Sequence, residues 1–293
     1  MDILTHITGE LARTLQRPVE IRSSGALGGG SINAAFLLDT SAGRFFIKLN
    51  QAQAAEMFAA EAAGLEELAA AEALRIPRPI AQGVAGGRAW LALEHLELSG
   101  PAAPARLGGA LARLHRHSAD AFGWTRDNTI GSTPQCNTRH SEWIAFWRDC
   151  RLGPQLRLAE SDGAPHDLLA DGERLLEVLP AFFDGYRPQC SLLHGDLWSG
   201  NWGYGSGGEP TIFDPAVYYG DREADIAMTE LFGSPGAAFY DAYDAAWPRD
   251  PGYGVRRTLY NVYHILNHHH LFGAGYGAQA GRMISGLLAE VGG

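Results

Sequence analysis

Short segments rich in hydrophobic residues recur within the first ninety or so residues of the chain. They predict strands over residues 19–22 and 33–38, on either side of a glycine-rich stretch, over residues 44–49, where two faces can be distinguished, and over the mostly apolar residues 89–94. In the third of these strands, Lys48 lies on the face opposite Phe45 and Ile47, because successive side chains point to opposite sides of a strand. The pattern therefore predicts a small lobe built around a sheet.

A helix is predicted from about residue 54 to residue 74. Helical spacing places four apolar residues on one face, namely Met57, Phe58, Leu65 and Leu68. Glu61 falls in the middle of that face, and a buried carboxylate needs a partner, so we expect it to pair with Lys48. The alternative is that Glu61 lies at the edge of a partly exposed helix and Lys48 is a surface residue.

The rest of the chain has a mainly helical pattern, with helices predicted over residues 105–117, 141–149 and 168–179. Residues 95–100 have the composition of a hinge. The predicted division is thus an N-lobe over residues 1–94, this hinge, and a C-lobe over residues 101–293. A chain of 293 residues is long enough to bury two cores.

Candidate chemistry is concentrated between His194 and Asp214. Asp196 precedes the amide of Asn201 by five residues, and Asp214 follows after a gap the length of a hairpin. A carboxylate on a rigid loop can orient a hydroxyl group and accept its proton, which makes Asp196 a candidate base. Magnesium prefers oxygen ligands, so Asn201 and Asp214 are candidate metal ligands. The alternative is an ordinary strand-to-turn transition in which each acid only caps a local element.

Two glycine-rich segments add to this picture. Residues 201–204 and 211–213 predict short strands joined by glycines 205, 207 and 208, a hairpin that would bring Asp214 back beside Asn201. The other segment includes Gly28, Gly29, Gly30 and Ser31 and lies between two predicted strands. Its backbone could approach phosphate oxygens closely, although glycine-rich hairpins are common turns. By analogy with kinase folds alone, adenine is expected to meet the backbone of Glu94 and Leu96.

The net charge of −10 comes without a basic run, which argues against nucleic-acid or anionic-membrane partners. The first four residues lack the basic start and apolar core of a signal peptide, so a cytoplasmic location is expected.

Three widely separated cysteines do not suggest a disulfide framework. His264 and His268 have a metal-ligand spacing but no accompanying acid motif, and structural helix histidines are the favoured interpretation.

The chain resembles the fructosamine kinases, also called ketosamine 3-kinases, within the aminoglycoside phosphotransferase and choline kinase group. Beyond Lys48, the resemblance is carried by residues 28–33, 57–61, 122–124, 128–135, 151–156, 194–201, 218–228 and 266–273. General kinase chemistry does not require the segment between residues 122 and 156, so its presence narrows the family.

The resemblance implies an α+β, two-lobed, protein-kinase-like fold. Its N-lobe would have a five-stranded antiparallel sheet with one main helix, and its larger C-lobe would be mainly helical. The implied reaction transfers the γ-phosphate of ATP, with Mg²⁺, to the 3-hydroxyl of a ketosamine. The acceptors would be fructosamine or ribulosamine adducts of amines or of protein lysines, so the cellular role would be deglycation.

Where this chain matches the motifs of the family, the resemblance implies a role for each motif residue. Asp196 would be the base, Asn201 and Asp214 would be the Mg²⁺ ligands, and Lys48 with Glu61 would hold the phosphates. Trp198 would offer an aromatic face to the sugar, and Asp225 would brace the catalytic loop without acting as a catalyst.

Two departures and two alternatives qualify this prediction. Ser31 stands where some members carry a regulatory cysteine, so a redox switch through that loop is not expected, and Pro215 after Asp214 argues against switching of the protein-kinase type. The alternatives are a small-molecule kinase of the aminoglycoside or choline kinase type and a catalytically silent nucleotide-binding module. The sequence leaves monomer and homodimer both open.

Overall fold

The computed structural model describes residues 3–28 and 32–292, which form two compact units. The first unit contains the described residues up to Ala103 together with the segment Gly203–Pro215. The second contains Pro104–Trp202 and the described residues from Ala216 onward. These units differ from the predicted lobes chiefly in one segment, Gly203–Pro215, which belongs with the first unit although it lies late in the sequence.

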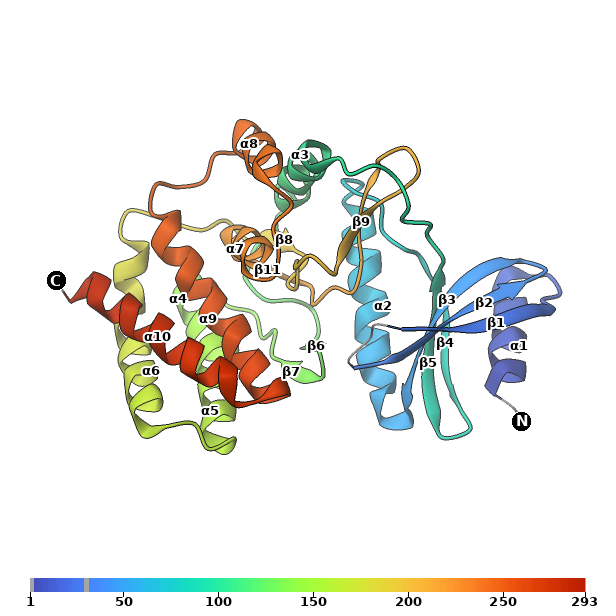
Figure 1. Cartoon of the computed structure of the whole chain (residues 1–293), viewed down its shortest axis with the longest axis horizontal. Helices are drawn as coiled ribbons and strands as arrows, with labels where there is room; N and C mark the ends of the chain where they lie inside the picture. The colour runs from blue at the N-terminus through green and yellow to red at the C-terminus, as the bar shows by residue number, and fades with distance from the viewer. Residues whose placement is uncertain (1–2, 29–31, 293) are drawn as a thin grey trace. The chain divides into compact units, whose positions relative to one another are not determined.

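The first unit is built on a five-stranded sheet with the order β1-β2-β3-β5-β4 (Figure 1). Its strands are β1 (Ile21–Leu27), β2 (Ala34–Thr40), β3 (Gly43–Gln51), β4 (Pro79–Ala85) and β5 (Arg88–Glu94). Every neighbouring pair is antiparallel. The central position of β3 explains why Phe45 and Ile47 are buried, while the end of the strand next to the turn, Gly43 and Arg44, is exposed.

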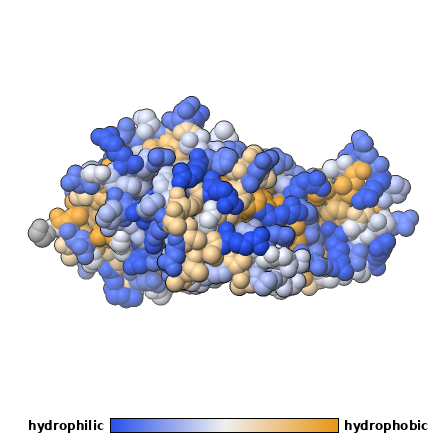
Figure 2. Space-filling view, turned by 90° about the horizontal axis from the view of Figure 1, so that it is seen from above, coloured by the Kyte–Doolittle hydropathy of each residue, from blue (hydrophilic) through white to orange (hydrophobic). Residues whose placement is uncertain are grey.

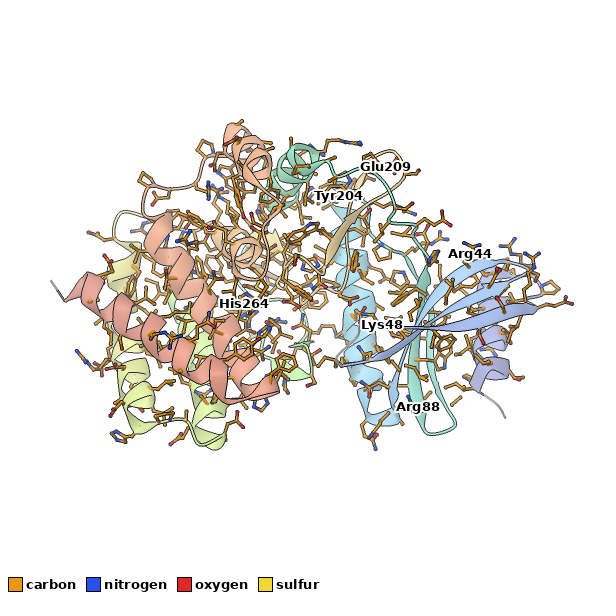
Figure 3. All side chains as sticks on the ribbon, viewed as in Figure 1. Arg44, Lys48, Arg88, Tyr204, Glu209 and His264 are labelled. Carbon is orange, nitrogen blue, oxygen red and sulfur yellow. The ribbon has the colours of Figure 1, made fainter. Side chains whose placement is uncertain are left out.

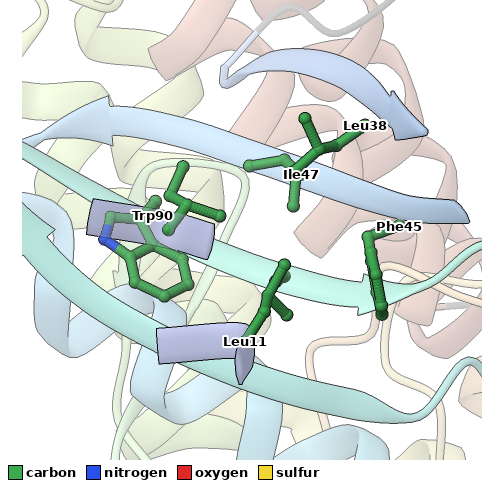
Figure 4. Packing of buried hydrophobic residues seen from close by; sticks show 7 residues of the cluster. Leu11, Leu38, Phe45, Ile47 and Trp90 are labelled. Carbon is green, nitrogen blue, oxygen red and sulfur yellow. The ribbon is translucent and has the colours of Figure 1, made fainter. Parts of the chain in front are cut away.

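Two main helices accompany this sheet. Helix α1 (Ile3–Leu15) was not predicted from the sequence; Ile7 and Leu11, one helical turn apart, bury against Phe45, Ile47 and other sheet residues (Figure 4). The predicted helix after the third strand is confirmed as a short 3₁₀ turn (Ala52–Ala54) followed by α2 (Ala55–Ala70). It ends before residue 74.

The late segment of the first unit contains most of a hairpin of β9 (Trp202–Tyr204) and β10 (Pro210–Ile212), close to the predicted strands. The amide of Arg75 donates to Pro210 O at 3.1 Å, and Ile212 N donates to Arg75 O at 3.2 Å. These bonds, together with the hydrogen bond from Gly100 N to Tyr204 O, attach the hairpin to the residues after α2 and β5.

The second unit is mainly helical. Its helices are α3 (Pro104–His115), α4 (Trp143–Trp147), a π-helix (Arg148–Leu152), α5 (Gly153–Ser161), α6 (His166–Val178), a 3₁₀ helix (Leu179–Phe183), α7 (Glu223–Leu231), α8 (Ala237–Ala246), α9 (Tyr253–Phe272) and α10 (Ala274–Val291). Its short strands are β6 (Asn128–Ile130), β7 (Thr133–Gln135), β8 (Ser191–Leu193) and β11 (Tyr218–Gly220). The three predicted helices are confirmed as α3, α4 and α6, with shifted ends.

Helix α9 runs through the core of this unit, because every side chain from Leu259 to Asn267 is buried. Within the described residues, no helix is both long enough and apolar enough to cross a membrane. Figure 2 shows hydrophilic residues interspersed with hydrophobic ones on the face that it draws. The large apolar side chains that are exposed among the described residues are Ile21, Leu27, Val84, Leu98, Trp198 and Phe272.

Candidate active site

The first unit contains a buried cation held by two acids. Lys48 in β3 is only 5% exposed and projects toward α2 (Figure 3). Its Nζ lies 2.6 Å from Oε1 of Glu61 and 2.5 Å from Oδ1 of Asp214, to which it donates a hydrogen bond. The predicted pair of Lys48 and Glu61 is therefore confirmed, and Asp214 joins it as a partner that was not predicted from the sequence.

The electrostatics of this cluster keep the lysine charged. Burial alone would lower the pKa of Lys48, but the carboxylates of Glu61 and Asp214 outweigh it and raise the pKa above its ordinary value. The Asp214 side chain remains 46% exposed, in contrast to the 11% of Glu61. One acid thus anchors the lysine in the interior, while the other holds it at an edge where a ligand can reach.

We expect the Glu61→Ala substitution to lower the free energy of unfolding by about 3 kcal/mol, because it removes one partner of a buried charge. Chemical denaturation in the absence of nucleotide measures this loss. Glu66→Ala is the matched control, since Glu66 is an exposed residue of the same helix. Equal stability of the two variants would contradict the importance of the buried pair.

Asp214 has an unusual backbone conformation. Its φ of +56° lies in the left-handed region, which the side chain of aspartate tolerates better than most. It comes directly after β10 and Phe213, so the backbone turns sharply where the strand ends. This turn, together with the hydrogen bond from Lys48, defines the direction of the carboxylate.

In the second unit, the segment after β8 forms a tight loop. Gly195 has a φ of +84°, and a Cβ placed there would lie 2.1 Å from Ala216 O, so only glycine fits. Ala216 N donates to His194 O at 2.9 Å, which ties this loop to the residue two positions after Asp214 in sequence. Backbone contacts therefore already hold the shape of this loop, without any contribution from its side chains.

The carboxylate of Asp225 holds the same loop from α7. Its Oδ2 accepts a hydrogen bond from His194 N at 2.7 Å, and its Oδ1 accepts one from Gly195 N at 2.8 Å. The predicted bracing role of Asp225 is consistent with these bonds. Burial would raise its pKa, but hydrogen bonds from His115 and from the loop outweigh this and hold the pKa below its ordinary value.

His115 in α3 extends this support and was not among the residues expected at the site. Burial lowers the pKa of His115, so the ring is neutral at pH 7. Its Nε2 lies 3.2 Å from Asp225 Oδ2 and its Nδ1 lies 2.8 Å from the Tyr243 hydroxyl. Since Asp225 can only accept, Nε2 carries the proton. In the sequence, the only indication of this role is that His115 is a polar residue on the buried face of α3.

We expect Asp225→Asn to destabilise the protein by about 3 kcal/mol, because two backbone N–H groups lose a charged acceptor. The folded-state pKa of Asp225 lies below its unfolded value, so its contribution is present at neutral pH and is lost as the pH falls below about 4. Denaturation at several pH values should show a constant difference from the parent protein between about pH 8 and pH 5 that narrows in acid. A difference that grew in acid would contradict the assignment.

Asp196 and Asn201 lie together on the supported loop. Asn201 is 4% exposed, and its Nδ2 donates to Asp196 O at 2.8 Å and to Asp196 Oδ2 at 3.3 Å. The amide of Asp196 donates to Nδ1 of His194 at 3.2 Å. The loop thus presents a partly exposed carboxylate whose orientation is set by a buried amide side chain.

Trp198 lies on the same loop with 39% of its surface exposed. Its ring passes so close to Gly200 that a Cβ there would come within 2.3 Å of it. The side chain is therefore held against the loop and still offers apolar area to solvent, which suits stacking against a ligand.

The remaining predicted site residues are only partly described. Gly28 follows β1, whereas Gly29, Gly30 and Ser31 lie outside the described residues. The backbone N–H of Glu94 donates a hydrogen bond to Arg78 O at 2.8 Å, so this N–H already has a partner within the first unit. Leu96 is half-buried.

The histidine run in α9 contacts its own helix and Asp162 at the end of α5. Nδ1–H of His268 donates to the carbonyl of His264 at 2.8 Å, and Nδ1 of His270 lies 2.7 Å from Asp162 Oδ2. Burial lowers the pKa of His264 to about 3. Among residues 3–28 and 32–292, no three His, Cys, Asp or Glu side chains are grouped so that they could hold a metal ion.

Known proteins resemble this chain over nearly its whole length. The sequence profile of the family described as "Fructosamine kinase" matches residues 3–290. The "Probable ketoamine kinase" of Synechocystis sp. is 44% identical over 285 residues, which are 96% of each protein. The "Protein-ribulosamine 3-kinase, chloroplastic" of Arabidopsis thaliana is 41% identical over 276 residues, covering 93% of this chain and 84% of that protein.

Solved structures agree with this similarity. A crystal structure from Haemophilus somnus, named "Putative fructosamine-3-kinase", has a TM-score of 0.87 at 27% identity and covers 96% of each chain. The aminoglycoside phosphotransferase APH(4)-Ia shares the fold at 14% identity, with a TM-score of 0.64 and coverage of 98% of this chain and 99% of that one; it was solved with AMP-PNP and hygromycin B. By the extent of the family match and the identity to its relatives, the chain belongs to the fructosamine kinase family of protein-kinase-like enzymes.

Proposed function

We propose that this chain transfers the γ-phosphate of ATP to the 3-hydroxyl of ketosamines and so initiates deglycation. The observation that carries the proposal is the cluster of Lys48 with Glu61 and Asp214. A buried amine whose pKa is raised by two carboxylates, beside a half-exposed acid, suits a nucleotide phosphate. The family match and the names of the relatives support a ketosamine acceptor.

The donor set fits magnesium-bound ATP. Asp214 supplies a carboxylate that solvent reaches, and Asn201 uses its Nδ2 toward Asp196, so its amide oxygen is the atom proposed to bind the metal. Bound Mg²⁺ would neutralise charge on the transferring phosphoryl group. The ammonium of Lys48 would orient the phosphates, with Glu61 holding it in place. Gly28, Gly29, Gly30 and Ser31, with the backbone at Glu94 and Leu96, are the other proposed nucleotide contacts.

Asp196 is the proposed base. Its carboxylate would accept a hydrogen bond from the acceptor hydroxyl and take its proton as the bond to phosphorus forms. Asn201 would limit the rotation of this carboxylate, since it already donates to both Oδ2 and the backbone oxygen of Asp196. Asp225 and His115 would act only by positioning the loop.

The proposed acceptors are small ketosamines or glycated proteins in the cytoplasm. A glycated lysine side chain and a free adduct expose the same sugar atoms, so the same site chemistry serves both. We propose neither a nucleic-acid nor a membrane partner, because the net charge is −10 and the sequence carries no basic run.

A substrate panel tests the proposed function. Pure protein with magnesium and ATP would be incubated with fructosyl-lysine, ribulosyl-lysine, choline or an aminoglycoside, and ADP release would be followed. We expect turnover with one or both ketosamines and the phosphate at O3 of the product. ADP release with choline or the aminoglycoside alone would favour the small-molecule kinase alternative. Nucleotide binding with no turnover would favour a silent module.

We expect Trp198→Ala to raise KM for the ketosamine about tenfold while KM for ATP stays unchanged, since the lost interaction is aromatic contact with the sugar. Initial rates at varied concentrations of each substrate separate the two constants. Trp198→Phe should retain most of the affinity, because it keeps an aromatic face. An equal rise in both KM values would contradict a sugar-specific role.

A further inference from the structure

Two of the three cysteines meet in the second unit. Cys136 follows β7 and is partly exposed, and Cys150 lies within the π-helix Arg148–Leu152 and is 4% exposed. Their Sγ atoms are 3.3 Å apart although both thiols are free. None of the proposed steps of phosphoryl transfer uses this pair.

We propose that Cys136 and Cys150 form an oxidation site at which a peroxide converts the two thiols into an intrachain disulfide. The sulfur atoms need to approach by only about 1 Å to reach the bond length of ~2.05 Å. The bridge would close a short loop, from β7 to the π-helix.

The backbone around both cysteines is held by one buried side chain. Nη1 of Arg151 donates to Cys136 O at 2.6 Å and to Cys150 O at 2.8 Å, and its Nη2 donates to Asn137 Oδ1 at 2.7 Å. The guanidinium carbon also lies 3.9 Å from the centre of the Tyr218 ring. Because Arg151 binds the carbonyl groups of both cysteines, it holds the two backbone segments together, so that the thiols lie close to each other.

The two thiols have different environments. Burial opposes ionisation of Cys136, but hydrogen bonds involving Thr138 and the Cys150 thiol outweigh it and lower its pKa. Burial and the neighbouring sulfur raise the pKa of Cys150 to about 12. Cys136 is thus the exposed, more readily ionised partner, and Cys150 is the thiol that stays protonated until attack.

This difference sets the order of the chemical steps. The Cys136 thiolate attacks one oxygen of hydrogen peroxide, the O–O bond breaks, and a sulfenic acid and water form once a proton is taken up. The Cys150 sulfur then attacks the Cys136 sulfur, the S–O bond breaks, and the departing hydroxide takes the Cys150 proton as water. Overall, two thiols are oxidised and one peroxide is reduced to two waters.

The test treats the folded, full-length protein with hydrogen peroxide and counts thiols after denaturation without reductant. We expect the count to fall from three to one, with the mass reduced by two hydrogen atoms and a peptide linking Cys136 to Cys150. Dithiothreitol should restore all three thiols. No kinase assay enters this test, so its failure is independent of the proposed function.

Cysteine variants separate the site from general oxidation. Cys190→Ser should still lose two thiols to the same linked peptide, whereas Cys136→Ser and Cys150→Ser should form no intrachain bridge and leave a sulfenic acid or no product. A bridge to Cys190, a disulfide between two chains, or oxygen adducts without a linked peptide in the parent protein would each overturn the proposal. If Cys136→Ser or Cys150→Ser folds poorly, the results for the parent protein and for Cys190→Ser still show whether the disulfide forms.

Discussion

Asp196→Asn should lower kcat for ketosamine phosphorylation by a factor of about 10³ while leaving ATP binding close to that of the parent protein. The substitution keeps the size of the side chain, and its oxygen can still accept the hydrogen bond from Asn201. It removes only the ability to take a proton from the acceptor hydroxyl. Steady-state kinetics with a ketosamine, combined with calorimetric titration of a non-hydrolysable ATP analogue, measures both quantities.

Asp184→Asn provides the matched control, because Asp184 is an exposed acid in the same unit, shortly before β8. It should leave kcat and nucleotide binding unchanged. Near-normal turnover by Asp196→Asn would show that another group takes the proton. Loss of nucleotide binding together with turnover would instead point to a disturbed loop, and thermal unfolding of the variant distinguishes that case.

Asp214→Asn should lower kcat/KM for ATP at least a hundredfold and shift activity to higher magnesium concentration. An amide is a weaker magnesium ligand than a carboxylate, and Lys48 loses one of its two negative partners. Asparagine is chosen because it tolerates the left-handed backbone at this position, where φ is +56°, so the variant tests charge and not strain. Rates measured across a magnesium series give the shift.

Glu209→Gln is the control for this second prediction, since Glu209 is an exposed acid of the same hairpin (Figure 3). Its magnesium dependence should match that of the parent protein. The two aspartate variants should also differ from each other: Asp196→Asn keeps ATP affinity and Asp214→Asn loses it. An unchanged magnesium response in Asp214→Asn would remove it from the proposed metal ligands.

Local patterns predicted much of the first unit. The two faces of residues 44–49 identified β3, the apolar run of residues 89–94 identified β5, and the helical face around Glu61 anticipated its ion pair with Lys48. These predictions succeed because the spacing of apolar residues indicates which side of a strand or helix is buried. A carboxylate on a buried face also requires a cation nearby, which limits the possible partners. Helix α1 was missed although Leu4, Ile7 and Leu11 have helical spacing, and β4 was not anticipated at Pro79–Ala85, because glycine and proline interrupt its pattern and its pairing with β5 forms only on folding.

The contacts that support the loop carrying Asp196 depended more strongly on the tertiary structure. His115 and Asp225 are 110 residues apart in sequence, and the bond between them follows from the packing of α3 near α7 and β8. The pairing of Lys48 with Asp214, 166 residues away, likewise depends on the late hairpin joining the first unit. Neither contact could be predicted from the spacing of hydrophobic and polar residues, because its partners lie far apart in the sequence.

The sequence by itself determined the kind of chemistry, because Asp196, Asn201 and Asp214 occur in the order and spacing that phosphoryl transfer requires, and the wider resemblance determined the family. Only the tertiary structure decided how those groups are supported: which acids hold Lys48, which carboxylate binds the loop, and that Cys136 meets Cys150. The physical reason is that residue type and spacing encode what a group can do, whereas its charge state and orientation depend on neighbours that long-range packing brings to it.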